Sequence, residues 1–553
     1  MKLKYKIFVT VLLAAFATTS CNKYLDVNSD NSNPQDPDVS SVFPTQLGNI
    51  PRGLQYDARY VSRFIQNFGS ASSGSTTAIN WDKMGFQSAS DVNGDIWRMT
   101  YYGLGANLNY IITKGIANGQ WDYVGAAYAL KAMSFQYTTD YHGDIIFKEA
   151  FPADENQVFF KYDNQETVYA GVDSLCRMAL TYLSRTDYNP SVSRLSKGDY
   201  AYDGNVDRWK KFVYGLLARN FHRITNKASY QADSVIKYCD LSLASAQDDF
   251  GIPFDAQKND DANFFGIFRD NLTLFRQTNY IVSLLDGTTL TGTTGGANID
   301  PRMKHMLSRS ADSSGTNNGG YKGVVVGVGD PQYSSLGTNR KAVPTPFGDS
   351  IYVITAGNFS GSQGKYLFAN KVVMPIMTSA EIQFMKAEAL FRKSDKPKAL
   401  LAYQAGIRLH FDFINRTSWP RGNTPLFNVT AISPAERDAY MASANVKQIA
   451  DSLTLSDIML QKYIALYGWG FFETWVDMRR YHYTDLDPNK IEQGIQVYKN
   501  LVLPTFAAEN AGRPVYRVRP RYNSEYIWNV EELRKIGAMN GNYHTYECWF
   551  SQP

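Results

Sequence analysis

The sequence predicts a mainly α-helical fold in which an irregular, loop-rich module separates two sets of helices. Apolar residues recur at helical spacing in long segments on both sides of the middle of the chain. Several of these segments also carry clustered Gly and Ala, which let helices pack closely, as in helix hairpins of the tetratricopeptide kind. Residues 251–376 instead are dense in Gly, Ser, Thr, Asn and Pro, so we expect loops and a few short strands there.

The first segment of the chain has the form of a secretory signal. Three lysines within the first six residues precede an apolar run at residues 7–17, and small residues then lead to Cys21. This run is shorter than the roughly 20 residues that span a bilayer, but it suits a signal peptide. We therefore expect residues 1–20 to be removed and Cys21 to carry a lipid that attaches the protein to the membrane. An ordinary signal peptide with an incidental cysteine is the alternative.

The polar residues around and after this cysteine predict a flexible tether at residues 21–41. Within the tether, Asp26, Asn28 and Asp30 have the spacing that opens a calcium loop. The glycine and the glutamate that complete such a loop are missing, so we predict neither a calcium site nor any other metal or cofactor.

Charge and cysteine content exclude two further classes of protein. The net charge is +4, of which three charges belong to the expected signal, so no basic surface for nucleic acid is predicted. Besides Cys21 there are three widely separated cysteines, too few for a disulfide framework, although one bond stays open; they are Cys176, Cys239 and Cys548. The aromatic content of 14% is high and suits either a tyrosine-rich core or a surface that stacks on flat ligand faces.

The helical pattern is clearest at residues 121–139. Ala126, Leu130 and Met133 repeat as one buried stripe, and the glycines and alanines beside them allow a neighbouring helix to approach closely. A polar cluster with a glycine at residues 140–144 then predicts the end of this helix. Further helices are predicted in the first half of the chain at residues 42–67, 92–116, 167–184, 207–225 and 230–245.

A polar loop rich in Ser, Thr and Gly is predicted between the first two helices, after residue 67 and before residue 92. It carries one tryptophan, Trp81, which lies between Asn80 and Asp82. A lone tryptophan in a polar loop either packs back onto the core or is displayed for binding. The sequence leaves both interpretations open.

Helices resume after the module. Thr378 and Glu381 have the spacing of a capping box, and a second helix at residues 398–413 shows a similar pattern of small residues, so the two are predicted to form a hairpin. Another pair is predicted at residues 435–450 and 454–469. We expect roughly eight to ten helices in total, followed by an irregular C-terminal part.

Sequence motifs of catalysis are absent. The chain contains no His-Glu-x-x-His zinc motif, no Gly-x-Ser-x-Gly nucleophile turn and no glycine-rich phosphate loop, and its six histidines are scattered without metal spacing. A pair of catalytic carboxylates cannot be recognised in a sequence, because their separation is set in space. Because no recognisable motif of catalysis is present, we predict that the protein is not an enzyme.

Four segments, in this order, resemble the SusD/RagB family of Bacteroidota outer-membrane lipoproteins; they are KYLDVNSDNSNP, DRWKKFVYGLLARNFHRI, PIMTSAEIQFMKAEALFR and IMLQKYIALYGWGFFETWVDMRRYHY. In the last segment, Tyr463 stands where the family more often has Trp. The other positions of the family pattern hold the expected residues, which are Gln461, Lys462, Ala465, Leu466, Glu473, Trp475, Asp477, Arg479 and Arg480.

Two further stretches fit the same family with small departures. The corner DYHGDI resembles the family's Tyr-Gly-Asp-Val-Pro corner, with His142 inserted and no proline after it. Near the C-terminus, the stretch RVRPRY at residues 517–522, with Glu525 and Asn529, resembles the family's Arg-x-x-Tyr-Pro…Glu…Asn ending, although Asn523 stands where that ending has its proline. The resemblance covers essentially the whole chain after the expected signal.

The resemblance implies a SusD-like fold with about four tetratricopeptide-like hairpins and a position at the cell surface, attached to the outer membrane by the lipid. It also implies that the hairpins pack against a SusC-like TonB-dependent outer-membrane transporter, over which the protein opens and closes as a lid. The expected organisation is a signal at 1–20, a lipidated tether at 21–41 and a single domain at 42–553. That domain would consist of a helical scaffold at 42–250 and 377–483, a ligand module at 251–376 and an irregular end at 484–553.

The family's ligand is usually an oligosaccharide and in some members a peptide. The apolar face of a sugar stacks on aromatic rings and its hydroxyls need amide or carboxylate partners. The resemblance places such contacts in the loop before the second predicted helix and at the start of that helix. The candidate ligand-binding residues are therefore Asn80, Trp81, Asp82, Trp97 and Tyr101.

Two alternatives to glycan capture stay open. The protein captures peptides or another nutrient for the same kind of transporter, or it is a helical scaffold that binds no small ligand. For Trp97 and Tyr101 a core position is also open, because both share one helical face with Leu104.

A block of charged residues near residue 475 is predicted to be structural. Glu473, Asp477, Arg479 and Arg480 lie within a turn or two of each other on a predicted helix. This spacing suits ion pairs within the chain and interactions at the helix end.

Overall fold

The computed structural model describes most of the chain after residue 35. The described residues are 36–71, 76–85, 94–152, 154, 156–310, 320–330, 343–347, 353–355, 358–360, 364–424, 426, 429–520 and 522–553. Cys21, most of the expected tether and the calcium-like spacing within it lie outside these residues.

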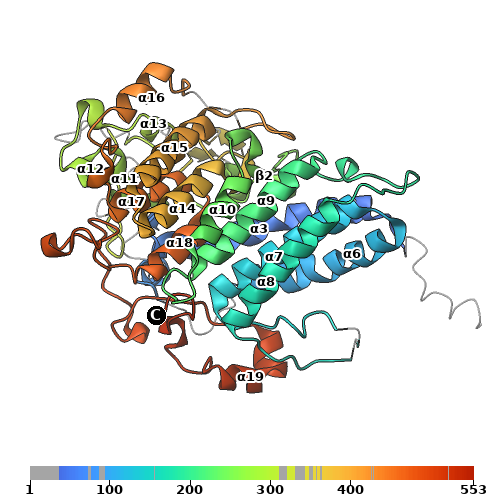
Figure 1. The fold of residues 1–553 in the computed structure, drawn as a ribbon. Helices are drawn as coiled ribbons and strands as arrows, with labels where there is room; N and C mark the ends of the chain where they lie inside the picture. Colours follow the sequence, from blue (N-terminus) through green and yellow to red (C-terminus); the bar gives the residue numbers. More distant parts are fainter. Residues whose placement is uncertain are drawn as a thin grey trace, which may run out of the picture.

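Two sets of long helices dominate the fold, as predicted (Figure 1). The first set contains α3 (Val39–Phe64), α6 (Ala106–Asn118), α7 (Trp121–His142), α8 (Gln165–Leu183), α9 (Val206–Arg223) and α10 (Ala232–Leu241). The second set contains α14 (Ser379–Arg392), α15 (Lys396–Asn415), α17 (Leu455–Leu466) and α18 (Phe471–Arg480). Shorter helices complete the described part of the chain; they are α4 (Thr76–Asp82), α5 (Asp95–Arg98), α11 (Asn279–Leu285), α12 (Thr288–Thr291), α13 (Met303–Met306), α16 (Pro434–Met441) and α19 (Val530–Lys535).

The strands form three antiparallel pairs, which agrees with the few short strands expected in the module. They are β1 (Phe68–Ser70) with β3 (Phe275–Gln277), β2 (Phe250–Pro253) with β6 (Val373–Met377), and β4 (Val353–Thr355) with β5 (Asn358–Ser360). In the second pair Phe250 lies opposite Met377, so the two ends of the module are joined at its base. This pairing brings α10 and α14, which flank the module in the sequence, into contact.

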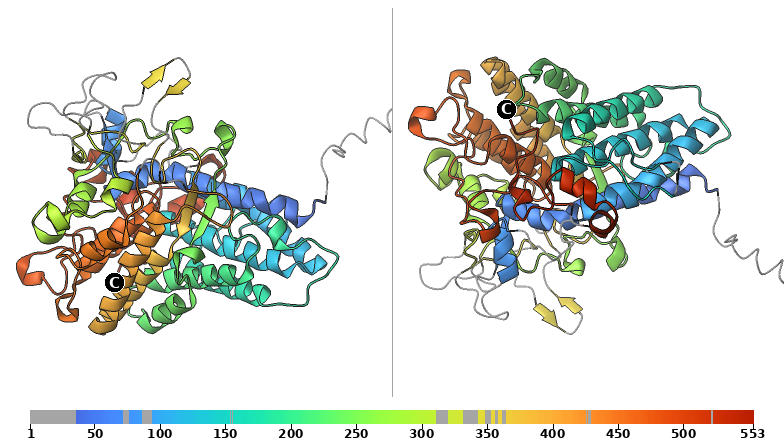
Figure 2. Two further views of the ribbon diagram at one scale, coloured as in Figure 1. Left: turned by 90° about the horizontal axis from the view of Figure 1, so that it is seen from above. Right: turned by 90° about the horizontal axis from the view of Figure 1, so that it is seen from below.

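The helices pack in a continuous series. α7 contacts α6 and α8, α9 contacts α8 and α10, and α14 contacts α10, α15 and α17. Figure 2 shows α3 extending past both sets, where it contacts α6, α7 and α18. The small residues of α7 permit the close approach that the sequence predicted, because a Cβ atom on Gly125 would lie 2.5 Å from Cγ of Leu183 on α8.

The end of α7 was predicted too early. The helix continues through Asp140 to His142 and ends at Gly143, whose φ is +84°. Asp140 is not a turn residue because its carboxylate has partners in the core: it accepts hydrogen bonds from Arg223 at 2.9 Å and from the Tyr169 hydroxyl at 2.6 Å. A polar side chain with buried partners gives the same sequence signal as a helix end.

Other predictions also differ from the structure. The helix predicted at residues 435–450 is shorter, because α16 ends at Met441. Trp81 lies in the short helix α4, whereas the sequence predicted a loop. The predicted helix at 92–116 is a continuous run of α5, a π-helical segment and α6; the π-helix, η2, spans Met99–Gly105. A π-helix adds about one residue to each turn and has no periodic sequence signature of its own, so the pattern did not reveal it.

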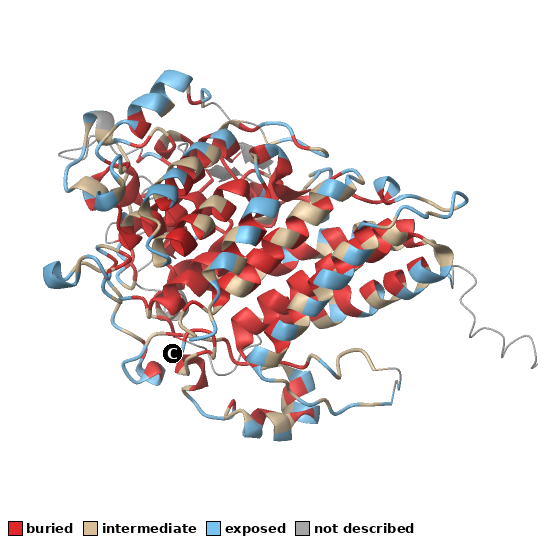
Figure 3. Cartoon of the chain, in the orientation of Figure 1, coloured by how far each residue is buried: buried red, intermediate tan, exposed pale blue. Residues whose placement is uncertain are grey.

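Charged side chains of five helices form a buried cluster in the core. Figure 3 shows the buried residues of the fold in red, concentrated where the helices face one another. The predicted pair within α18 is confirmed, because Arg480 donates to Asp477 at 2.7 Å. Most of the other pairs join different helices; they are Arg219–Glu381, Arg223–Glu473, Arg223–Asp140, Arg480–Glu388, His222–Glu388 and Lys462–Asp477. The charged block near residue 475 therefore links helices that are distant in the sequence.

Candidate functional site

The five candidate residues named from the sequence fall into two groups. Trp97 and Tyr101 lie together, with ring centroids 4.6 Å apart, and both face a cavity of about 400 Å³. Asn80, Trp81 and Asp82 lie elsewhere, on α4, and none of them lines this cavity.

The α4 group is held mainly by contacts within the protein. Asp82 is buried and accepts hydrogen bonds from Arg63 at 2.6 Å and from the backbone N–H of Ser70 at 2.8 Å. Trp81 is half-buried and packs edge-on against Tyr60, with ring centroids 4.6 Å apart. The amide of Asn80 donates to Glu509 at 3.1 Å. Their role in ligand binding stays a prediction.

Trp97 and Tyr101 are positioned by the run α5–η2. The N-terminus of this run has no side-chain cap of its own, but Asp57 on α3 replaces one, because an oxygen of its carboxyl group accepts the backbone N–H of Ile96 at 2.8 Å. Behind the indole of Trp97 lie the rings of His142 and Tyr522, each with its centroid 5.3 Å away. Trp97 is only 6% exposed, so it forms the floor of the cavity.

The opposite wall comes from the C-terminal part of the chain. It is a second π-helix, η11 (Ser524–Trp528), followed by Asn529. Among the described residues, η2 and η11 are the two π-helices, and both line the same cavity. Because π-helical turns occur frequently at functional sites, their meeting here marks this cavity as the leading candidate.

The loop between α7 and α8 forms the third side of the cavity, and hydrogen bonds attach it to the C-terminal wall. Asn529 accepts a hydrogen bond from the backbone N–H of Phe160 at 3.2 Å and donates to its carbonyl at 2.9 Å. The hydroxyl of Tyr162 donates to Glu525 at 2.6 Å. In Figure 1 this loop, in turquoise, lies beside the red segment that carries α19.

The lining of the cavity is aromatic and apolar with a few polar groups. The lining residues are Trp97, Tyr101, Ile146, Ala150, Phe151, Pro152, Gln157, Val158, Phe160, Ser524, Glu525, Trp528 and Asn529. Glu525 is the only lining residue with an acidic or basic side chain. Burial raises the pKa of its carboxyl group above the ordinary value. Such a cavity suits an uncharged ligand that offers apolar faces together with hydroxyl or amide groups.

Two neighbouring cavities share residues with this one. One, of about 600 Å³, lies beyond Trp97 and Tyr101 and includes Tyr56, Arg98 and Tyr102. The other, of about 570 Å³, lies beyond Val158 and Trp528 and includes Phe159, Glu531 and Glu532. We call the three cavities together the π-groove. All three have the size of small-molecule sites.

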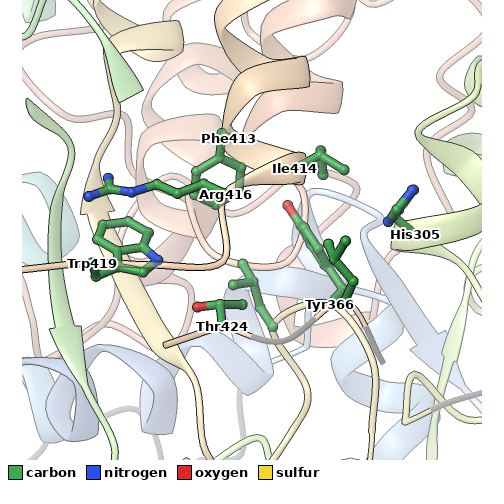
Figure 4. A pocket seen from close by; sticks show the side chains of 9 residues that line it. His305, Tyr366, Phe413, Ile414, Arg416, Trp419 and Thr424 are labelled. Atoms are coloured by element: carbon green, nitrogen blue, oxygen red, sulfur yellow. The ribbon is translucent and has the colours of Figure 1, made fainter. Parts of the chain in front are cut away.

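Two further cavities are less suitable for a glycan. One, of about 620 Å³, is lined by many charged side chains, including Arg52, Asp255 and Lys371. The other, shown in Figure 4, is lined by Tyr366, Trp419 and other buried residues and holds about 20 Å³, enough for a water molecule but not for a sugar ring. The module at 251–376 contributes to these two cavities and not to the π-groove.

The sequence analysis missed Phe159, Phe160 and Trp528, and used Glu525 and Asn529 only as marks of a family resemblance. The available signal was the apolar run Tyr526-Ile527-Trp528, with two aromatic residues, in a stretch without helical periodicity. In the part of the chain that the structure describes, no group of three or more His, Cys, Asp or Glu side chains is arranged to hold a metal ion. Nor is any helix there both long and apolar enough to cross a membrane.

Comparisons with known proteins agree with this architecture. The chain is similar to a solved chitin-binding protein (19% identity, TM-score 0.67, covering 93% of this chain and 99% of the other). It is also similar to a SusD/RagB family protein from Bacteroides thetaiotaomicron (21% identity, TM-score 0.64, 93% and 99% covered) and to a chitin-binding SusD homologue from Flavobacterium johnsoniae (18% identity, TM-score 0.62, 93% and 98% covered).

At these identities the solved structures show a shared fold. No curated protein matches the chain. The model of a SusD-like family, described as starch-binding and associating with the outer membrane, matches residues 44–504, which is most of the sequence. Together with the helical fold, this match shows that the chain belongs to the SusD/RagB family.

Proposed function

We propose that this protein binds an uncharged glycan in the π-groove and delivers it to a SusC-like TonB-dependent transporter in the outer membrane. The single observation that carries the glycan-binding part is the cavity between the two π-helices, whose aromatic lining contains one carboxyl group and no basic side chain. Membership of a starch-binding family and the fold shared with two chitin-binding proteins support a sugar as the ligand. The proposed role is binding without catalysis.

The remaining parts of the proposal concern location and partner. We propose that Cys21 carries the lipid and holds the protein at the cell surface, and that the helical scaffold contacts the transporter. Family membership supports both. Co-purification from detergent-extracted membranes, followed by mass spectrometry, tests the partner; recovery of a TonB-dependent transporter is expected with the wild type and not after Cys21→Ser. Recovery of the protein without any transporter would contradict the partnership.

The first test is affinity gel electrophoresis of residues 36–553 with soluble starch or glycol chitin in the gel and with a denatured control. Slowed migration in one polysaccharide is expected. Unchanged migration in every polysaccharide, together with retention of oligopeptides, would replace the glycan by a peptide. Absence of binding in both tests would leave only the scaffold role.

Substitution of Trp97 tests where the glycan binds. Trp97→Ala removes the floor of the cavity, so we expect binding to weaken by about 1–3 kcal/mol, while Trp97→Phe, which keeps a ring, loses less. Isothermal titration with the retained polysaccharide gives the affinities, and circular dichroism confirms that the variants are folded. Trp81→Ala is the matched variant for the second candidate group. A loss for Trp81→Ala and none for Trp97→Ala would move the site to α4.

A further inference from the structure

The outer end of the π-groove is a ledge of exposed aromatic side chains. Five aromatic side chains are exposed in the described part of the chain; they are Tyr102, Phe159, Tyr200, Phe268 and Trp528. Phe159 (65% exposed) and Trp528 (55% exposed) both line the cavity of about 570 Å³ at this end. Large apolar rings left in water at adjacent positions are a mark of a binding surface.

The ledge is continuous with the proposed glycan cavity. Five residues line both cavities; they are Gln157, Val158, Phe160, Trp528 and Asn529. A ligand that leaves the central cavity past Trp528 therefore passes directly onto the ledge. A buried platform, Trp97, and an exposed platform, Trp528, belong to the same groove.

Hydrogen bonds hold the two halves of the ledge together. Asn529 binds both backbone groups of Phe160, and the carboxylate of Glu532 accepts the backbone N–H of Tyr162 at 3.1 Å. Within the loop, Glu149 accepts the backbone N–H of Lys161 at 2.8 Å. The loop and the C-terminal segment thus form one fastened surface.

The charges around the ledge neutralise each other. Lys161 lies 3.8 Å from Glu149, and Glu531 and Glu532 form ion pairs with Arg534 and Lys535. No excess of either charge is left to attract an ionic ligand. Together with flat aromatic faces, this favours an uncharged sugar chain over an acidic one.

We propose that the Phe159–Trp528 ledge is a second glycan subsite, which binds further units of the same uncharged chain whose first unit lies against Trp97. This inference rests on the proposed function and adds that the ligand is an oligomer or polymer spanning both platforms. The ledge residues lie beyond residue 504, where the family match ends, or in the loop fastened to that segment. Specificity for chain length is therefore a property of this C-terminal wall.

Affinity as a function of chain length tests the subsite. The probes are chito-oligosaccharides and malto-oligosaccharides of two to six units, titrated calorimetrically into residues 36–553. For the series that binds, affinity is expected to rise by about tenfold from the shortest to the longest member, since one more stacked ring contributes about that much. Phe159→Ala removes a ledge ring that does not line the central cavity, so it is expected to reduce this rise and to leave the affinity for the disaccharide unchanged.

Phe268→Ala removes an exposed aromatic ring outside the π-groove and is the matched control; its affinities are expected to equal those of the wild type at every length. Equal affinity for all lengths would overturn the second subsite, as would a Phe159→Ala variant that keeps the full rise. Binding of neither series would also overturn it. Retention of the wild type in polysaccharide gels would in each case leave the proposed function standing, so the two failures are distinguishable.

Discussion

Glu388→Ala is expected to lower the free energy of unfolding by about 3–5 kcal/mol, the largest effect of any single substitution considered for this protein. Glu388 is fully buried on α14 and accepts hydrogen bonds from both terminal nitrogens of Arg480, at 2.7 and 2.9 Å. Its carboxylate also hydrogen-bonds with Nε2 of His222 at 2.8 Å and accepts a hydrogen bond from Nε of Arg392 at 3.1 Å. Alanine would leave a buried guanidinium without its main anion, and such a charge costs more than the lost pair contributed.

Electrostatic attraction, in addition to packing, stabilises the buried cluster around Glu388 and Arg480. Burial by itself would raise the pKa of Glu388, but Arg480 and His222 together, through charge and hydrogen bonds, outweigh burial and hold the pKa well below its ordinary value. Glu388→Gln keeps the volume and part of the hydrogen bonding, so its loss is expected to be smaller than that of alanine. Urea denaturation followed by circular dichroism measures both. Glu531→Ala, at an exposed ion pair, is the control and should change stability by less than about 1 kcal/mol. A loss that small for Glu388→Ala would contradict this account.

The scaffold followed from the sequence because its helices obey a local rule. In α7 and α9 the apolar spacing and the small residues lie within one segment, so periodicity located both helices to within a few residues. Asp140 shows the limit of prediction from local sequence patterns. Its carboxylate looked like a turn signal, but its partner Arg223 comes from another helix that only the fold brings close.

The candidate site depends on contacts that no local pattern contains. Trp97 was named from the family resemblance, and the structure places it in a cavity. The wall opposite it comes from Glu525 and Trp528, in a segment that follows the entire helical scaffold. Neither π-helix has a repeating pattern, and the loop that joins the walls is fastened by Asn529 binding backbone groups of Phe160. Side-chain identity could suggest a sugar site, but only the three-dimensional arrangement shows the cavity that we propose as that site.

Asp57→Asn is expected to stabilise the protein, and increasingly so as the pH rises. Burial, with a smaller contribution from nearby Asp95, raises the pKa of Asp57 to about 8 in the folded protein, against an ordinary value of 3.8. The folded state therefore retains a proton at pH 5–8 that the unfolded state has released, so the wild type loses stability from this group as the pH rises towards 8. Asparagine does not titrate and escapes this loss.

The advantage of Asp57→Asn should therefore grow between pH 5 and pH 8 by up to about 1.4 kcal/mol per pH unit and level off above pH 8. Urea denaturation at pH 5, 6, 7 and 8 measures it, with Asp260→Asn, at an exposed carboxylate, as a control that shows no such trend. The asparagine oxygen can still accept the backbone N–H of Ile96, so Trp97 should stay in place and glycan affinity should not change. A stability difference that is the same at pH 5 and pH 8 would show that Asp57 is ionised in the folded protein. In that case Asp57 would cap the helix as a carboxylate, which the positive end of the helix dipole favours.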